Sequence, residues 1–251
     1  MTSIQISSDL HIECVNDDNI DPLQYITPSA DILILAGDIG SLYKIKQLKN
    51  FLKQLSYYFK IIIYVPGNHE YYYIDEKDQV PLNILNERLF DLGDMISNLH
   101  ILNCNSILIG NLCIAGCTLW SKPECKVPNF IVRIPEFNTS NYFNQHKKDL
   151  KYIVNIMKYC KNKEYKLLMI THHPPTHDVL KDTNRRKKYI SLYSTNLDYL
   201  LDKKYINTWI CGHIHKNFDF HSNKGCRVLG NQMGKPKDGI KDYDPKFTIN
   251  L

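Results

Sequence analysis

Short apolar runs recur along the chain, and each soon gives way to Gly, Asp, Asn or His. Runs of aliphatic and β-branched residues bounded by turn-forming residues are typical of buried strands, because a central strand is apolar on both faces. On this pattern we predict five core strands, over residues 4–6, 32–35, 61–65, 167–170 and 208–211.

Segments with helical spacing lie between these runs. Apolar residues three and four positions apart, with polar residues between them, predict amphipathic helices. The segments with this pattern are 44–59, 82–96, 144–161 and 192–203. Two short apolar stretches around Gly110-Asn111 predict a β-hairpin over 107–116. Alternating strands and helices indicate an α/β architecture, and the hairpin indicates two packed sheets rather than one.

The length and composition predict a single domain over residues 1–251. The chain is 43% hydrophobic, which is enough to bury a broad sheet with helices packed against it. The N-terminus has no basic stretch followed by an apolar run, and no segment approaches the roughly 20 apolar residues that span a bilayer. We therefore expect a soluble, cytoplasmic protein with no membrane partner.

The eight cysteines are scattered and form no C-x-x-C pair. In a chain of this length without a signal peptide, such cysteines are typically reduced. Cys113 and Cys117 flank small residues within a predicted strand. We expect them to pack in the core, and we expect no zinc ribbon.

The formal charge of +5 is unevenly distributed, with a basic pair at Lys147-Lys148 and a run of four basic residues from Arg185 to Lys188. A charge run is either a solvated face or a region that attracts a polyanionic substrate such as nucleic acid. His177 and this run follow the His-Pro-Pro turn, so they either overhang a site there or form an exposed segment. The irregular segments 121–143 and 175–190 are long enough to be functional or disordered.

Polar, potentially metal-binding side chains follow the predicted strands. They occur in Asp9-Leu10-His11, Gly37-Asp38, Gly67-Asn68-His69-Glu70, Thr171-His172-His173-Pro174-Pro175 and Gly212-His213-Ile214-His215. Residues i and i+2 of an extended segment point to one side, so Asp9 with His11, and His213 with His215, can each present two ligands to one point. Carboxylate, imidazole and amide oxygen without thiolate suit Mn²⁺, Fe²⁺/Fe³⁺, Zn²⁺ or Ni²⁺. The set is too large for one ion and suits two ions that share a carboxylate.

These five motifs, in this order, resemble the signature of the calcineurin-like metallophosphoesterases, and the resemblance covers nearly the whole chain. It implies a four-layer α-β-β-α sandwich with two mixed β-sheets and a dinuclear metal site at the strand ends. It also implies which residues bind metal: Asp9, His11 and His215 for one ion, Asn68, His172 and His213 for the other, and Asp38 bridging both.

The resemblance implies further roles around the metals. His69 is implied to face the substrate as the catalytic residue that donates a proton to, or hydrogen-bonds with, the leaving oxygen. The family pattern H-x-P favours His172 over His173 as the ligand, which leaves His173 beside the site. Glu13 and Glu70 either orient ligand histidines or are ordinary solvated loop acids.

Departures from the protein-phosphatase branch disfavour a phosphoprotein substrate. Ser8 precedes Asp9 where that branch has glycine. Ile39-Gly40-Ser41-Leu42 follows Asp38 and Pro66 precedes Gly67, so the arginines that grip phosphate in that branch are missing. The chain looks instead like a subgroup of small stand-alone phosphoesterases. That subgroup often has an Asn-Pro-Arg-Gly strand end; here Asn231-Gln232-Met233-Gly234 lacks the proline and arginine, which weakens a phosphate-gripping role for that loop.

The predicted function is hydrolysis of a phosphodiester or phosphomonoester, preferably a small nucleotide-type substrate, by a hydroxide that bridges two metal ions. One alternative is a nuclease or end-processing enzyme that binds nucleic acid through Arg185, Arg186, Lys187 and Lys188. Another is a catalytically silent metal-binding scaffold. The presence of the whole ligand set and of His69 argues against the scaffold.

Overall fold

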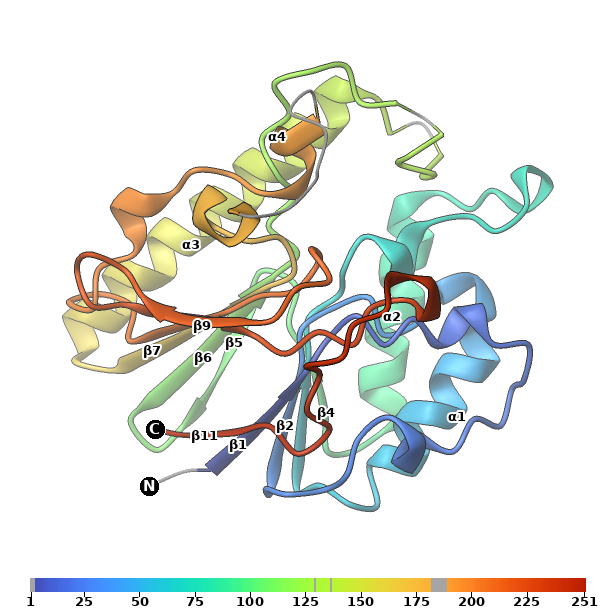
Figure 1. Ribbon diagram of the computed structural model, residues 1–251, viewed down its shortest axis with the longest axis horizontal. Helices are drawn as coiled ribbons and strands as arrows, with labels where there is room; N and C mark the ends of the chain where they lie inside the picture. The colour runs from blue at the N-terminus through green and yellow to red at the C-terminus, as the bar shows by residue number, and fades with distance from the viewer. Residues whose placement is uncertain (1–2, 129, 136, 182–188) are drawn as a thin grey trace.

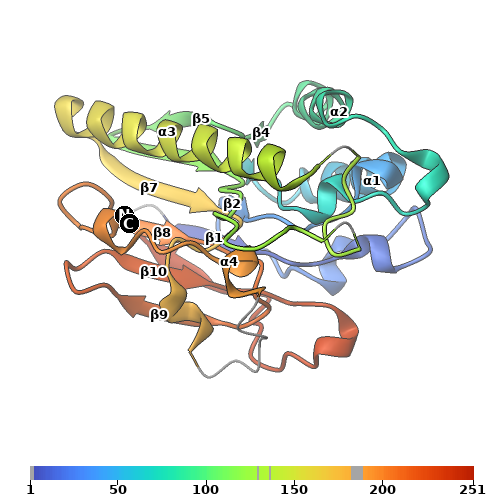
Figure 2. The same cartoon turned by 90° about the horizontal axis from the view of Figure 1, so that it is seen from above.

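Two mixed β-sheets face each other in the computed structural model, which describes residues 3–128, 130–135, 137–181 and 189–251 (Figure 1). In the first sheet four parallel strands are flanked by one antiparallel strand, β11. Its order is β11 (Thr248–Asn250), β1 (Ser3–Ser7), β2 (Ile32–Leu35), β3 (Ile61–Tyr64) and β4 (Leu99–Ile101). The pairing of β1 with β11 brings the two ends of the chain side by side (Figures 1 and 2).

The second sheet has a parallel centre and an antiparallel strand at each edge. Its order is β5 (Asn105–Ile109), β6 (Leu112–Cys117), β7 (Lys166–Thr171), β8 (Thr208–Ile210), β10 (Arg227–Gly230) and β9 (Phe218–His221). The predicted hairpin is confirmed, because β5 and β6 pair antiparallel around Gly110, whose φ of +60° suits glycine. The sequence pattern missed the short strands β4, β9, β10 and β11.

Helices cover the outer face of each sheet (Figures 1 and 2). α1 (Ile45–Leu55) and α2 (Leu82–Met95) pack on the first sheet, and α3 (Thr139–Lys163) packs on the second. No helix within the described part of the chain is long and apolar enough to cross a membrane. The predicted four-layer α-β-β-α sandwich is confirmed.

Alternation along each central strand explains why these strands are apolar throughout. In β2, Leu33 and Leu35 face the helices while Ile32 and Ile34 face the other sheet. In β7 the same alternation sends Leu167 and Met169 toward α3 and the residues between them into the layer between the sheets. Strands buried on both faces therefore appear in the sequence as continuous hydrophobic runs.

Two cysteines illustrate the packing of the second sheet. Cys113 and Cys117 are buried in β6 beneath α3, as expected for core residues. All eight cysteines are free thiols. They therefore contribute as small apolar side chains in the core or as surface groups.

Helix boundaries differ from the prediction chiefly at three places. α1 ends at Leu55, four residues before the predicted end at 59, where the N–H groups of Tyr57 and Tyr58 donate to the carbonyls three residues earlier and form a tighter turn. α3 begins five residues before the predicted start, because the side chain of Asn138 caps it by accepting the N–H of Asn141. The predicted helix over 192–203 is wrong. Only α4 (Ile190–Tyr193) and a 3₁₀ turn, Asp198–Leu200, form there. Between them, the N–H groups of Thr195 and Leu197 donate to the carbonyls of Pro174 and Pro175, which holds the chain in a non-helical path.

Candidate metal centre

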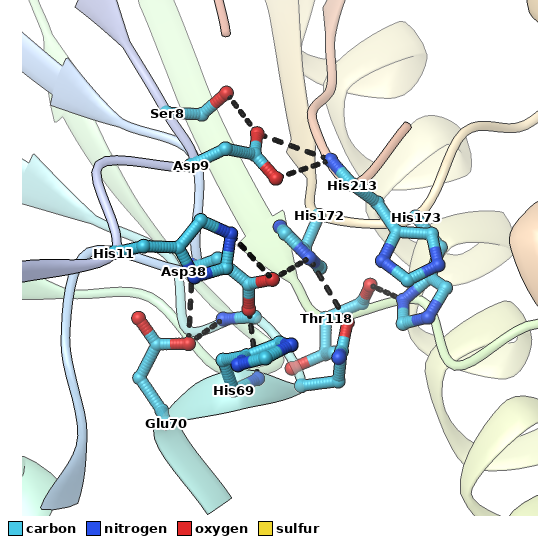
Figure 3. A network of polar contacts seen from close by, with 12 residues as sticks. Ser8, Asp9, His11, Asp38, His69, Glu70, Thr118, His172, His173 and His213 are labelled. Carbon is cyan, nitrogen blue, oxygen red and sulfur yellow. Dashed lines mark hydrogen bonds and ion pairs between the residues drawn. The ribbon is translucent and has the colours of Figure 1, made fainter. Parts of the chain in front are cut away.

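The predicted ligands follow strands whose carboxyl ends meet at one edge of the two sheets. The loops after β1, β2 and β3 come from the first sheet, and those after β7 and β8 come from the second. The carboxyl edge of parallel strands is where α/β folds place their ligand sites. The pairing of the strands thus brings together side chains that are distant in sequence (Figure 3).

The backbone is strained at these residues. Among the described residues, eight other than glycine have a positive φ, and five of them are predicted metal ligands. The five are Asp9 (56°), His11 (49°), Asp38 (53°), His213 (75°) and His215 (49°). This conformation costs roughly 1–3 kcal/mol for each such residue and persists only where the surroundings enforce it. Strain is therefore concentrated at the candidate site.

The left-handed backbone conformation contradicts one expectation. We predicted that Asp9 and His11, and likewise His213 and His215, would converge because they alternate on an extended segment. All four residues are left-handed instead, so they converge through tight turns. Backbone hydrogen bonds hold the first of these turns: Asp9 N–H donates to the Gly37 carbonyl at 2.9 Å and His11 N–H to the Asp38 carbonyl at 3.0 Å.

A first group of candidate ligands comprises Asp9, His11, Asp38 and His215. One ligand atom from each lies within 4.8 Å of the others. The two Nε2 atoms of His11 and His215 are 3.0 Å apart, and His215 Nε2 lies 3.4 Å from Asp9 Oδ1. The first three side chains are buried and His215 is partly buried. This group matches the predicted site for one ion together with the shared carboxylate.

A second group comprises Asp38, His172 and His213, again with ligand atoms within 4.8 Å. His172 Nε2 lies 3.3 Å from Asp38 Oδ2 and 3.1 Å from Asn68 Oδ1. Figure 3 shows the Asp38 carboxylate between the imidazoles of His11 and His172. Asp38 belongs to both groups, which is the arrangement that a bridging ligand requires.

His173 lies beside the second group rather than in it. Its ring is centred 4.0 Å from that of His213, and its Nδ1 lies 3.3 Å from the Thr118 carbonyl. Burial lowers its pKa to about 3, so the ring stays neutral. The structure thus places His172, and not His173, among the candidate ligands.

In three candidate ligand histidines, the ring nitrogen that faces away from the site has a hydrogen-bond partner. Nδ1 of His11 lies 2.9 Å from Glu13 Oε1, that of His172 lies 2.9 Å from the Ala36 carbonyl, and that of His215 lies 2.6 Å from Asp238 Oδ2. An acceptor at Nδ1 fixes the tautomer that leaves Nε2 free to bind a metal. Sequence reasoning missed Asp238, which lies in a 3₁₀ turn without any motif.

Glu13 lies two residues after the candidate ligand His11 and contacts two histidines. Glu13 contacts Nδ1 of both His11 and His69; burial disfavours its charge, but these imidazoles outweigh burial and lower its pKa to about 2. It therefore orients histidines, which is one of the two alternatives left open by the sequence.

Glu70 is fully buried and binds backbone instead. Its carboxylate accepts the N–H groups of Asp38, Ile39 and Gly67 and the hydroxyl of Tyr64. Burial and the nearby charge of Asp38 raise its pKa to about 8. Glu70 ties the loop after β2 to the loop after β3, so it fixes where Asp38 stands relative to Asn68.

His69 lies at the edge of the centre. Its backbone N–H donates to Asp38 Oδ1 at 2.8 Å, and its side chain is 17% exposed. Burial lowers its pKa, with Asp38 acting in the opposite sense. Its Nε2 lies 3.1 Å from Nζ of Lys235. Lys235 is not among the residues predicted for the site. With His11 and Glu13, His69 also forms a third group of possible metal-binding atoms.

A cavity of about 500 Å³ opens beside His69. Its lining includes Glu13 and Tyr72, together with the cations Lys44, Arg133, Lys235 and Lys237. These cations come from segments that share no motif, so no sequence signal indicated them. We call this space the cationic cavity.

The residues present fit divalent metal ions. Buried Asp9 and Asp38 have lowered pKa values, because surrounding imidazoles outweigh the effect of burial. Ionised carboxylates, imidazole Nε2 atoms and the amide oxygen of Asn68 are therefore directed at one small region, as a centre for first-row cations requires.

The predicted basic run lies outside the described residues, namely Arg185, Arg186, Lys187 and Lys188. His177 is described, and its Nδ1 lies 2.7 Å from the Ser194 hydroxyl. It is therefore engaged with the segment after α4 rather than with a candidate ligand.

Comparisons with known proteins agree with this geometry. A family model described as calcineurin-like phosphoesterase matches residues 3–217. An uncharacterised protein of Acanthamoeba polyphaga mimivirus is 26% identical over 282 aligned residues, covering 100% of this chain and 97% of that protein.

Two solved structures share the fold. Phosphopantetheinyl hydrolase of Mycobacterium tuberculosis superposes with a TM-score of 0.75 at 15% identity, over 98% of each chain. A dimetal phosphatase from Danio rerio superposes with a TM-score of 0.54 at 13% identity, over 91% of this chain and 86% of that one. At these identities the likeness concerns the fold alone.

Proposed function

Because the chain belongs to the calcineurin-like phosphoesterase family, whose members are metal-dependent phosphoric ester hydrolases, we propose that it hydrolyses a small phosphodiester or phosphomonoester of the nucleotide type. The observation that carries the proposal is the sharing of Asp38 between two groups of ligand atoms. Two divalent ions, when bound, supply activated water and stabilise the charge of the transferred phosphoryl group.

The proposed ligands divide between the two sheets. Asp9, His11 and Asp38 approach from the first sheet, and His172, His213 and His215 approach from the second, with Asn68 completing the set. We assign Asp9, His11 and His215 to one ion, Asn68, His172 and His213 to the other, and Asp38 to both. The donor set suits manganese, iron, zinc or nickel.

His69 provides the proton chemistry in this proposal. Glu13 Oε1 holds its Nδ1 at 3.3 Å, which leaves Nε2 directed toward the cationic cavity. In its doubly protonated form, with one proton on Nδ1 facing Glu13 and one on Nε2, it donates the Nε2 proton to, or hydrogen-bonds with, the leaving oxygen of the ester. Lys235 stands at the same nitrogen and offers a positive charge to phosphate oxygens there.

The size of the cationic cavity favours a small substrate. Pockets for small molecules have volumes of roughly 300–1,000 Å³, and this cavity of about 500 Å³ falls within that range. The proposed partner is therefore a small phosphate ester.

The test is hydrolysis of bis-p-nitrophenyl phosphate and p-nitrophenyl phosphate by the purified protein, with and without added Mn²⁺. We expect p-nitrophenolate release that disappears on exhaustive chelation and returns with metal. Asp38→Ala protein, purified in parallel, controls for a contaminating phosphatase. Activity that survives chelation, or that is equal in the variant, would contradict the proposal, as would turnover of phosphoproteins alone.

A further inference from the structure

The cationic cavity has an unusual balance of charge. Four cations line it, and the lining includes one carboxylate, Glu13, which is already engaged by His11 and His69. Within the described part of the chain, none of the four cations has an ion pair with a carboxylate within 4.0 Å. A concave surface with uncompensated charge of one sign attracts ligands of the opposite sign.

The cations are distributed from the metal centre outward. Lys235 is the innermost, with Nζ 3.1 Å from His69 Nε2. The ring of Tyr72, centred 4.8 Å from that of His69, forms the next part of the wall, and the Arg133 guanidinium lies over it at 5.8 Å. The cavity therefore presents one cation beside the site of hydrolysis and another beyond an aromatic ring.

Lys44 and Lys237 are the remaining two cations of the lining. Lys44 is fixed, because its Nζ donates to the carbonyls of Glu13 and Val15 at 2.8 and 3.3 Å. Lys237 is exposed in the 3₁₀ turn Pro236–Asp238. Arg133, with a planar fork of donors, is the side chain best suited to grip phosphate oxygens in a bidentate manner.

We propose that the cationic cavity binds a second phosphate group of the substrate, separate from the phosphate that is hydrolysed. The volume of about 500 Å³ exceeds what one phosphate needs and accommodates a nucleoside-sized linker that carries a terminal phosphate. The preferred substrates are thus small esters with two phosphates, such as nucleoside bisphosphates. The inference rests on the proposed function and specifies its substrate class.

The test compares two substrates with the same leaving group: the 5′-p-nitrophenyl ester of thymidine 5′-phosphate, and the same ester with an added 3′-phosphate. We expect the lower KM for the 3′-phosphorylated ester. In the double variant Arg133→Gln with Lys237→Gln, KM for that ester should rise about 10- to 100-fold, as expected for loss of charged hydrogen bonds. The constants for the ester without the 3′-phosphate should stay nearly unchanged.

Two controls make the comparison specific. Lys151→Gln with Lys158→Gln removes the same charge from the exposed face of α3 and should leave both KM values unchanged. Arg133→Lys keeps the charge and should recover part of the lost affinity. Lys237→Gln alone changes an exposed residue, so it provides a folded variant if the double variant unfolds.

Calorimetric binding of thymidine 3′,5′-bisphosphate separates this inference from the proposed function, because it needs no turnover. Hydrolysis of both esters with equal KM, and unaltered bisphosphate binding by the double variant, would overturn the second-phosphate site while the hydrolase proposal stands. Absence of hydrolysis, with binding that the double variant weakens, would overturn the hydrolase proposal and support the phosphate site. A double variant that slows cleavage of a single-stranded oligonucleotide more than that of the bisphosphate ester would instead assign the cavity to nucleic acid and overturn the proposal.

Discussion

The metal centre and the cationic cavity are neighbours, yet they handle charge in opposite ways. In the centre, the carboxylates of Asp9 and Asp38 are buried among imidazoles, and each charge has an immediate counterpart. In the cavity, cations such as Arg133 and Lys235 are only partly buried and have no carboxylate partner among the described ion pairs. His69 stands at the boundary, with Asp38 on one side and Lys235 on the other.

This difference in burial and charge suits the two regions to metal binding and to substrate binding, respectively. Buried, compensated groups are rigid, because each polar atom depends on a fixed partner, and they suit the geometric demands of metal binding. Partly exposed, uncompensated cations keep water as an alternative partner, so they can exchange it for substrate phosphate. The centre would therefore govern the rate of chemistry, and the cavity would govern which ester is bound.

The strongest test of that division is Asp38→Asn. The substitution removes the carboxylate that both ligand groups share. Because two-metal stabilisation is worth several kcal/mol, we expect turnover to fall by about 10³-fold or more. Metal analysis should show fewer bound ions, while thymidine 3′,5′-bisphosphate should still bind to the cavity. Full metal content with normal turnover would break the distinction between the two regions.

His69→Ala probes the boundary between them. General acid assistance is worth about 10²- to 10⁴-fold, and the loss should be largest for esters with poor leaving groups. Metal content should remain that of the unsubstituted protein, because His69 is not assigned as a ligand. Steady-state kinetics with alkyl and p-nitrophenyl esters, together with metal analysis, checks both expectations. A variant that lacks one metal would place His69 in the centre through its group with His11 and Glu13.

Glu70→Gln tests the rigidity of the centre. Glutamine has one carbonyl oxygen, whereas both oxygens of Glu70 accept hydrogen bonds, so some of the donors from Asp38, Ile39, Gly67 and Tyr64 would lose their acceptor. Replacing a residue that supports a metal ligand typically lowers metal affinity by about 10- to 100-fold. Titration of the metal-free variant with Mn²⁺ should show weakening in that range. Unchanged affinity would mean that the loops after β2 and β3 hold their positions without this carboxylate.

A buried carboxylate away from both regions isolates the effect of burial from that of metal binding. Asp149 accepts hydrogen bonds from Cys104 and from the N–H of Trp120, but burial raises its pKa from 3.8 to about 6. The folded protein thus holds this proton more tightly than the unfolded chain. The associated stability is complete below about pH 3.8 and is lost as pH rises through about 6.

Asp149→Asn should remove that part of the pH dependence. Between about pH 4 and pH 7 the difference between variant and unsubstituted protein should change by at most about 3 kcal/mol. Urea unfolding at several pH values, with chelator present to exclude metal binding, measures it. Parallel pH profiles for the two proteins would show that Asp149 ionises normally in the folded state.

The elements predicted correctly are those whose local pattern agrees with their tertiary environment. The apolar run of β7 is buried on both faces, and the period of α1 matches the side that covers β2. The segment 192–203 has a helical period, but Thr195 and Leu197 bond to the His-Pro-Pro turn instead of continuing a helix. Hydrogen bonds from outside a segment therefore overrode its own pattern.

The sequence alone determined which candidate ligands could meet, because each lies within five residues after the end of a strand and parallel strands bring their carboxyl ends to one edge. Only the tertiary structure decided how those ligands converge, since the left-handed turns at Asp9 and His213 are imposed by contacts from other loops. The tertiary structure also created the cationic cavity. Lys44, Arg133 and Lys235 are far apart along the chain, and a charge acquires its role from what it faces across space rather than from its neighbours in sequence.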